Sequence, residues 1–302
     1  MVDEWPEVAE TEVLDQYISP RAALYHGDVC DVLPGLPSNS MGYAICSPPF
    51  ASLYTYSNSD RDIGNCRSYE EFFEHVSFVL REVLRVLKPG RSLSMHCMQI
   101  PTLKERDGHI GLMDFRGHLI AAAEKVGFYF HSEVCIWKDP VVAMQRTKAL
   151  GLLWKQIKKD STMSRQGIAD YLVTLRKPGE NAEPVAHTPQ DVPVDLWQKW
   201  ASPVWMDIDP GETLQHRSVR EHEDERHICP LQLEVYRRGL RLWSNPGDTI
   251  LEPFGGIGSG AVVALELERK CVAVELKPSY YRQMVANVRA AENAGRQKNL
   301  FA

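Results

Sequence analysis

The chain has 302 residues, of which 44% are hydrophobic and 25% are charged, as in ordinary globular proteins. This length suits one large α/β domain with an insertion, or two modest domains. No apolar run approaches the roughly 20 residues of a membrane span, and the first residues lack a signal-peptide pattern, so we expect a cytoplasmic protein without a membrane partner. The net charge of −6 excludes a protein that is basic all over, although DNA binding requires only a local positive face.

Strands and helices alternate through the first half of the chain. Apolar runs predict strands at 22–25, 41–46, 92–97 and 128–137. A helix is expected after Ser68, where a capping-box sequence precedes apolar residues at helical spacing, and it should end at Lys88-Pro89-Gly90. A second helix is expected near 115–126. This alternation predicts a mostly parallel sheet with helices on both faces.

The pattern weakens between 138 and 225, where only residues 171–175 form a clear strand. Charge is segregated there. Residues 138–177 hold nine Lys or Arg and three Asp, whereas residues 178–226 hold four Lys or Arg and eleven Asp or Glu. Regular structure resumes afterwards, with helices expected at 231–243, from 259 and at 278–291, and strands at 249–251 and 271–275.

The seven cysteines are scattered, without a Cys-x-x-Cys pair or a clustered histidine partner. An odd, dispersed set is typical of reduced core thiols rather than of disulfides or zinc ligands. We therefore expect no metal site.

Residues 249–275 form a strand, a glycine-rich turn, a helix, a second strand and then an acid. The glycines of Glu252-Pro-Phe-Gly-Gly-Ile-Gly258 allow backbone N–H groups to approach a ligand at a helix N-terminus. Glu275 follows Gly255 by 20 residues, a spacing at which an acid can hold ribose hydroxyls. By itself this pattern is compatible with a bound dinucleotide, with bound S-adenosyl-L-methionine or with a tight turn alone.

The expected strand at 41–46 runs directly into Ser47-Pro48-Pro49-Phe50. An amino group conjugated to a base ring is a poor nucleophile, and acceptors that hold its hydrogens favour a more tetrahedral nitrogen. The Ser47 hydroxyl and the Pro48 carbonyl suit this role, because consecutive prolines fix the carbonyl in place. Phe50 could stack on a base swung out of the duplex. Alternatively, the tetrapeptide has only a structural role, as a proline turn after an edge strand.

Together the two motifs resemble the β-group of S-adenosylmethionine-dependent DNA amino-methyltransferases, in which the catalytic tetrapeptide precedes the cofactor loop. The resemblance implies that the cofactor site includes Asp28, Glu252, Phe254, Gly255, Gly256, Gly258 and Glu275. It also implies that the segment containing His227, Cys229 and Pro230 closes over the methionine carboxylate. The chain departs from the family pattern at Glu252, where Asp is usual, and at Leu231, where Lys is commoner.

The resemblance further implies a Rossmann-like core made of residues 21–137 and 226–291, with a target-recognition region at 138–225. In that region Lys155, Lys158, Lys159 and Arg165 are the expected contacts to double-stranded DNA. A homodimer is typical of this group, and a partner endonuclease is unknown.

The target base is a choice between two amino groups. Serine at the first position of the tetrapeptide is associated with N4-cytosine enzymes. The continuation 51–65 resembles phage and prophage orphan methyltransferases, which are associated mainly with adenine, and we favour N6-adenine on that ground. Two further alternatives are an NAD-dependent oxidoreductase, which gives Ser-Pro-Pro-Phe no role, and a non-catalytic DNA-binding protein.

Overall fold

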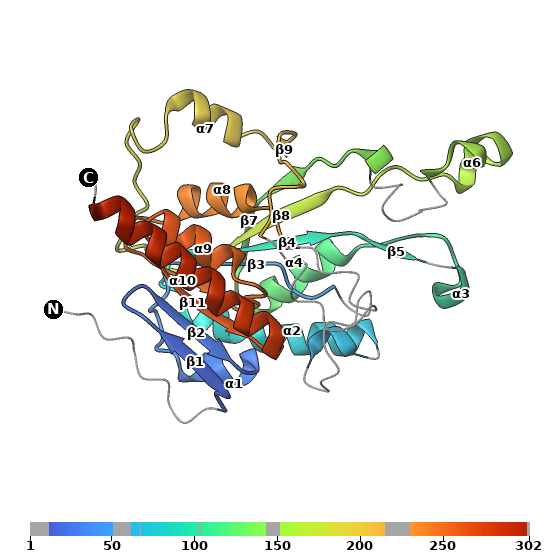
Figure 1. Cartoon of the computed structure of the whole chain (residues 1–302). Helices are drawn as coiled ribbons and strands as arrows, with labels where there is room; N and C mark the ends of the chain where they lie inside the picture. Colours follow the sequence, from blue (N-terminus) through green and yellow to red (C-terminus); the bar gives the residue numbers. More distant parts are fainter. Residues whose placement is uncertain are drawn as a thin grey trace.

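A computed structural model of the chain describes residues 12–50, 62–66, 68–102, 104–142, 152–214 and 230–300. A nine-stranded sheet runs through its centre in the order β1-β2-β11-β10-β3-β4-β8-β7-β9 (Figure 1). The five strands β2, β11, β10, β3 and β4 are parallel to their neighbours in this series. The pairs β1–β2, β4–β8 and β7–β8 are antiparallel. The expected mostly parallel α/β fold is confirmed.

Seven of the nine strands lie close to the predicted positions, and the two others, at 15–18 and 204–205, were not predicted. Their bounds are β1 Asp15–Ile18, β2 Ala22–His26, β3 Tyr43–Cys46, β4 Ser92–Met98, β7 Tyr129–Ile136, β8 Asp170–Arg176, β9 Val204–Trp205, β10 Thr249–Glu252 and β11 Lys270–Glu275. A separate two-stranded sheet pairs β5 (Ile100–Thr102) with β6 (Gly111–Met113).

Helices cover both faces of the sheet (Figure 1). Apolar residues of α1 (Val29–Val32), α2 (Tyr69–Val86) and α4 (Phe115–Val126) form one core with the strands. On the other face the second core contains α8 (Leu233–Trp243), α9 (Ser259–Glu266) and α10 (Pro278–Leu300). The helix α10 extends beyond the predicted end near residue 291. Within the described residues, no helix combines the length and apolarity needed to cross a membrane.

Local sequence signals explain where the helices of the first core begin and end. Ser68 caps α2 by accepting a hydrogen bond from the Glu71 backbone N–H at 3.1 Å, as the capping sequence predicts. Asp114 caps α4 by accepting from Gly117 N at 3.0 Å. That helix stops at Gly127, whose φ of 121° is a conformation that favours glycine.

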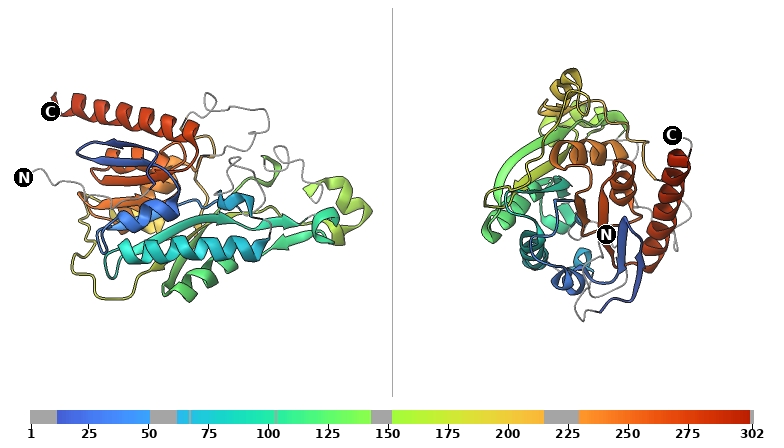
Figure 2. Two further views of the ribbon diagram at one scale, coloured as in Figure 1. Left: turned by 90° about the horizontal axis from the view of Figure 1, so that it is seen from below. Right: turned by 90° about the vertical axis from the view of Figure 1, so that its left-hand side faces the viewer.

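Two arms leave the sheet where β4 and β7 end. One arm is the β5–β6 hairpin with the short helix α3 (Lys104–Asp107), and the other joins β7 to β8 and carries α6 (Trp154–Lys159). Figure 1 and the left-hand view of Figure 2 place α3 and α6 at the same end of the molecule, away from β1 and the C-terminal end of α10. The second arm belongs to the predicted recognition region 138–225. That region is not a separate insertion throughout, because β8 lies inside the main sheet between β4 and β7.

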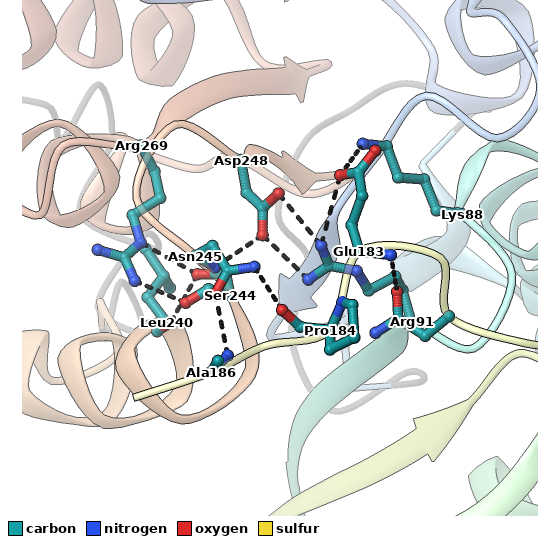
Figure 3. A network of polar contacts seen from close by, with 11 residues as sticks. Lys88, Arg91, Glu183, Pro184, Ala186, Leu240, Ser244, Asn245, Asp248 and Arg269 are labelled. Atoms are coloured by element: carbon teal, nitrogen blue, oxygen red, sulfur yellow. Dashed lines mark hydrogen bonds and ion pairs between the residues drawn. The ribbon is translucent and has the colours of Figure 1, made fainter. Parts of the chain in front are cut away.

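Polar contacts that include one buried ion pair join the opposite ends of the strands (Figure 3). Arg91, only 2% exposed, precedes β4 and donates to both carboxylate oxygens of Asp248, which precedes β10, at 3.0 and 3.3 Å. Lys88 pairs with Glu183 at 2.7 Å, and Asn245 donates to the Pro184 carbonyl. These contacts fix the chain after β8 across the start of the parallel strands, far from the strand ends that carry the motifs.

Candidate active site

The two motifs meet because they follow neighbouring strands. β10, which precedes the glycine loop, pairs in parallel with β3, which precedes Ser47. The next helix after β10, α9, packs on one face of the sheet, and the next helix after β3, α2, packs on the other. Such a switch point between neighbouring parallel strands opens a crevice at their carboxyl ends, where ligands of α/β proteins bind.

The glycine loop turns the chain from β10 into α9. Gly256 and Gly258 have φ values of 53° and 86°, in the left-handed region that favours glycine. Gly255 is needed for another reason, since a Cβ there would lie 2.9 Å from Met284 Sδ. The loop thus brings its backbone and the N-terminus of α9 to the pocket, which is the arrangement predicted from the sequence.

Glu275, at the end of β11, shapes the same loop. Its carboxylate accepts hydrogen bonds from Gly256 N at 2.7 Å and from Lys277 N at 2.8 Å. Burial raises the pKa of Glu275 to about 7, although these two amides oppose the shift. Because it also lines the pocket, its oxygens are available to hydroxyl donors on a ligand.

Glu252 occupies a different position from the one expected. It is 1% exposed and does not line the pocket. Its carboxylate accepts from the Tyr236 hydroxyl at 2.7 Å and from the Gly260 and Ala261 amides at 3.3 and 3.2 Å. Burial raises its pKa to about 8. Glu252 therefore anchors the first turn of α9 from behind the loop.

One pocket gathers most of the predicted residues. Its lining includes, from the predicted set, Asp28, Ser47, Pro48, Pro49, Phe50, Pro230, Phe254, Gly255, Gly256 and Glu275. Gly258 lies just outside this lining, at the N-terminus of α9. His227 and Cys229 lie outside the described residues. Asp28 also caps α1, accepting from Cys30 N at 2.9 Å.

Several lining residues were not predicted. They include Asp62 and Ile63 from the next described segment, Tyr236 from α8, Lys277 directly before α10 and Tyr280 in its first turn. Lys277 is 6% exposed, and its ammonium lies 4.4 Å from the centroid of the Tyr280 ring. A signal for Lys277 was present in the sequence, because it follows Glu275 by two residues in the same strand-to-helix turn.

Aromatic rings support the tetrapeptide from one side. The Phe50 ring lies 5.8 Å from Phe115 and makes an edge contact with His96 at 6.4 Å. Phe115 in turn contacts Phe72 and Phe73 of α2. Phe50 is thus backed by the core while still lining the pocket, a position from which a ring face can receive a flat ligand.

A line of polar side chains leads away from Ser47. The Ser47 hydroxyl lies 3.1 Å from His96 Nδ1. Asp170 Oδ2 lies 3.1 Å from His96 Nε2, off the ideal direction of a hydrogen bond but within ion-pair distance. Lys138 donates to Asp170 Oδ1 at 2.6 Å. Sequence reasoning missed His96 and Asp170, which are 7% and 2% exposed inside the sheet.

The predicted DNA contacts lie on the α6 arm. Lys155, Lys158 and Lys159 are all solvent-exposed on this helix. Arg165 is half-buried and donates to the Gln166 carbonyl at 3.1 Å, and burial lowers its pKa. The three lysines therefore present charge to solvent, whereas Arg165 is partly engaged within its own segment.

Comparison with known proteins identifies the class. The solved PvuII DNA methyltransferase (cytosine-N4-specific) has a similar fold, with a TM-score of 0.64 at 16% identity over 88% of this chain and 86% of that one. A DNA modification methylase of Thermus thermophilus, solved in complex with S-adenosyl-L-methionine, also gives a TM-score of 0.64, at 22% identity over 90% and 95% of the two chains. The fold is that of a DNA methyltransferase.

Sequence comparison then gives the family. The family model described as DNA methylase matches residues 43–286, and the chain belongs to this N6/N4 DNA methylase family. The type II methyltransferase M.BglII of Bacillus subtilis is 26% identical over 264 residues, which are 85% of this chain and 66% of that relative. M.Cfr9I of Citrobacter freundii is 23% identical over 290 residues, 86% and 85% of the two chains.

The chain is therefore a DNA amino-methyltransferase that uses S-adenosylmethionine. This confirms the resemblance to amino-methyltransferases and decides against an oxidoreductase or a non-catalytic DNA-binding protein.

Proposed function

We propose that this enzyme methylates the exocyclic amino group of a DNA base that has left the duplex and entered the pocket beside Phe50. The observation that carries the proposal is that the tetrapeptide residues Ser47 and Phe50 line one pocket with Glu275, which lies about two hundred residues later in the chain. A proline turn after an edge strand is a weaker account, since β3 lies inside the sheet between β10 and β4.

The pocket residues fit S-adenosylmethionine in two respects. The Glu275 carboxylate would accept hydrogen bonds from ribose hydroxyls, and its place at a β-strand end is typical of that role. The glycine loop brings its backbone to the pocket, where Gly255 and Gly256 form part of the lining. When bound, the cofactor supplies an electrophilic methyl on a sulfonium.

Ser47 and Pro48 would act on the acceptor nitrogen rather than on the cofactor. The Ser47 oxygen and the Pro48 carbonyl would each accept a hydrogen bond from the amino group, holding its lone pair toward the methyl. Fixed acceptors of this kind need no reorganisation during the reaction, which is the source of their effect. Phe50 would stack on the base and keep its ring in plane.

The base is proposed to be cytosine, methylated at N4. Two observations support this choice: serine stands at the first position of the tetrapeptide, and the structural relative PvuII methyltransferase is cytosine-N4-specific. N6-adenine, the choice favoured from the sequence, is the second candidate. Adenine is supported by the resemblance of segment 51–65 to phage and prophage orphan methyltransferases. The same resemblance supports an enzyme of the orphan type. Most of this segment lies outside the described residues.

The DNA would lie across the pocket between the two arms. The three exposed lysines of α6 supply positive charge on one arm, and phosphate neutralisation is the main source of affinity for DNA. Within the region 138–225, the arm between β7 and β8 would contact the target DNA sequence, whereas β8 belongs to the sheet. A homodimer, expected for this group, is proposed as the working assembly, and sedimentation of the free enzyme and of its DNA complex tests it.

The experiment that tests the proposal uses tritium-labelled S-adenosylmethionine and DNA from a host that lacks DNA methyltransferases. Label should enter the DNA, and nucleoside mass spectrometry should find N4-methylcytosine. N6-methyladenine instead would replace cytosine by the second candidate, and 5-methylcytosine or unlabelled DNA would overturn the proposed function.

A further inference from the structure

Ser47, His96, Asp170 and Lys138 form a continuous series of contacts that ends at the pocket. Each member comes from a different part of the fold: the turn after β3, the strand β4, the start of β8 and the turn after β7. The β4–β8 register pairs His96 with Leu172 and Met98 with Asp170, which makes His96 and Asp170 diagonal neighbours on the ladder.

We propose that His96 is the proton acceptor of the methyl transfer, reached through the Ser47 hydroxyl, and that Asp170 and Lys138 position and stabilise it. This inference rests on the proposed function, and it adds to it a route for the proton that the reaction must release.

The chemistry requires such a route. The amino nitrogen forms the new N–C bond with its lone pair, and the electrons of the broken S–C bond stay on sulfur. The nitrogen then carries a positive charge and must lose one hydrogen as a proton. In our proposal that proton passes to the Ser47 oxygen while the Ser47 hydroxyl proton passes to His96 Nδ1. Serine is restored, an imidazolium is formed, and His96 later returns the proton to solvent.

The contacts orient His96 for this task. For Nδ1 to accept from the Ser47 hydroxyl, the ring hydrogen must be on Nε2, which is the nitrogen that faces Asp170. An imidazolium formed in this buried position would gain from an adjacent carboxylate. The same logic, a hydroxyl, an imidazole and an orienting carboxylate, operates in serine hydrolases.

Asp170 is kept as a carboxylate by its surroundings. Burial alone would raise the pKa of Asp170, but His96 and Lys138 more than offset this and hold it below the ordinary value. Lys138 contacts both carboxylate oxygens, at 2.6 and 2.5 Å. A purely structural ion pair between β7 and β8 would need only Lys138 and Asp170. A purely structural role of this ion pair does not explain why His96 lies between Asp170 and Ser47.

The test is the single-turnover rate of methyl transfer to unmethylated genomic DNA in His96→Asn. Asparagine can accept a hydrogen bond from Ser47 but cannot take up a proton, so it separates positioning from proton transfer. We expect the rate to fall about 10²-fold or more, the usual scale of general base catalysis. Cofactor affinity by calorimetry and DNA affinity should remain within about threefold of wild type, because neither ligand site is altered. His131→Asn, an exposed histidine on β7, is the matched control and should match wild type.

A chemical readout separates catalysis from packing. In His96→Gly, added imidazole should restore a measurable part of the rate, which a merely structural histidine would not allow. If His96→Asn does not fold, Asp170→Asn tests the same step, since it keeps the size and one of the two Lys138 contacts but removes the charge that faces the imidazolium.

A near-normal rate in His96→Asn or in Asp170→Asn would overturn the relay. If Ser47→Ala is inactive in the same experiment, the proposed function stands without the relay. If the wild-type enzyme transfers no methyl to DNA at all, the proposed function itself has failed.

Discussion

Replacing Glu275 by Gln should weaken S-adenosylmethionine binding and remove most of its pH dependence. Glutamine keeps the size of the side chain but replaces one acceptor oxygen by an NH₂ donor. That donor would then face either the Gly256 or the Lys277 amide, which lie 2.7 and 2.8 Å from the present oxygens. The substitution thus removes the charge that would hold ribose hydroxyls and loosens the glycine loop at the same time.

The expected loss is about 2 to 3 kcal/mol of binding free energy, the scale of hydrogen bonds to a charged acceptor. This corresponds to a dissociation constant roughly 30- to 150-fold higher. Titration calorimetry at pH 8 measures it directly, with Glu124→Gln, an exposed residue of α4, as the matched control.

The pH dependence has a defined sign. Burial raises the pKa of Glu275 to about 7, so the carboxylate becomes protonated as the pH falls below that value. Hydroxyl donors prefer the ionised form, and wild-type cofactor affinity should therefore fall below pH 7 by up to about tenfold per unit.

The contribution of Glu275 to the stability of the ligand-free protein has the opposite trend. Its folded pKa lies above the ordinary value of 4.5, so its stabilising contribution is fully present below that value and is lost as the pH rises through about 7. Both trends should disappear in Glu275→Gln. An unchanged dissociation constant and an unchanged pH slope would show that Glu275 does not hold the cofactor.

Three further outcomes follow from the same structure. Ser47→Ala should lower the methyl-transfer rate by about 10²-fold or more at nearly unchanged cofactor affinity, and normal turnover would remove this residue from catalysis. Reversing the charges of Lys155, Lys158 and Lys159 together should weaken DNA binding and reduce the slope of log affinity against log salt concentration by up to about 0.9 per lost phosphate contact. An identical slope, with unchanged sedimentation, would show that these lysines are only solvated and do not contact DNA. Asp248→Ala should lower the free energy of unfolding by about 3 to 5 kcal/mol, because it leaves the buried Arg91 without its carboxylate partner. A denaturant titration that shows little change would refute a stabilising role of the Arg91–Asp248 ion pair.

Local signals explain what could be predicted from the sequence. The α2 helix was predictable because its Ser68 cap and its apolar spacing lie within one short segment. The glycine loop was predictable for the same reason, since a strand, three glycines and Glu275 follow in one continuous segment. The meeting of Ser47 with that loop required the family resemblance, because the pairing of β3 with β10 joins segments about two hundred residues apart.

The unpredicted residues depend on long-range geometry. Nothing near His96 in the sequence indicates a polar role, and its contact with Asp170 arises only from the antiparallel register of β4 and β8. Glu252 illustrates the reverse case. Its motif was recognised, but a carboxylate that accepts from Tyr236 and from the first turn of α9 is directed into the core, a choice set by packing rather than by the motif.

The measurement that most directly tests the central claim is base-resolved sequencing of DNA from a methyltransferase-free host that expresses the enzyme, compared with the same host expressing Ser47→Ala. We predict amino-methylated bases at a defined sequence in the first sample, with N4-methylcytosine as the modification, and their absence from the second. DNA without amino-methylation from the wild-type host, or equal modification in both hosts, would contradict the assignment of the pocket and of Ser47.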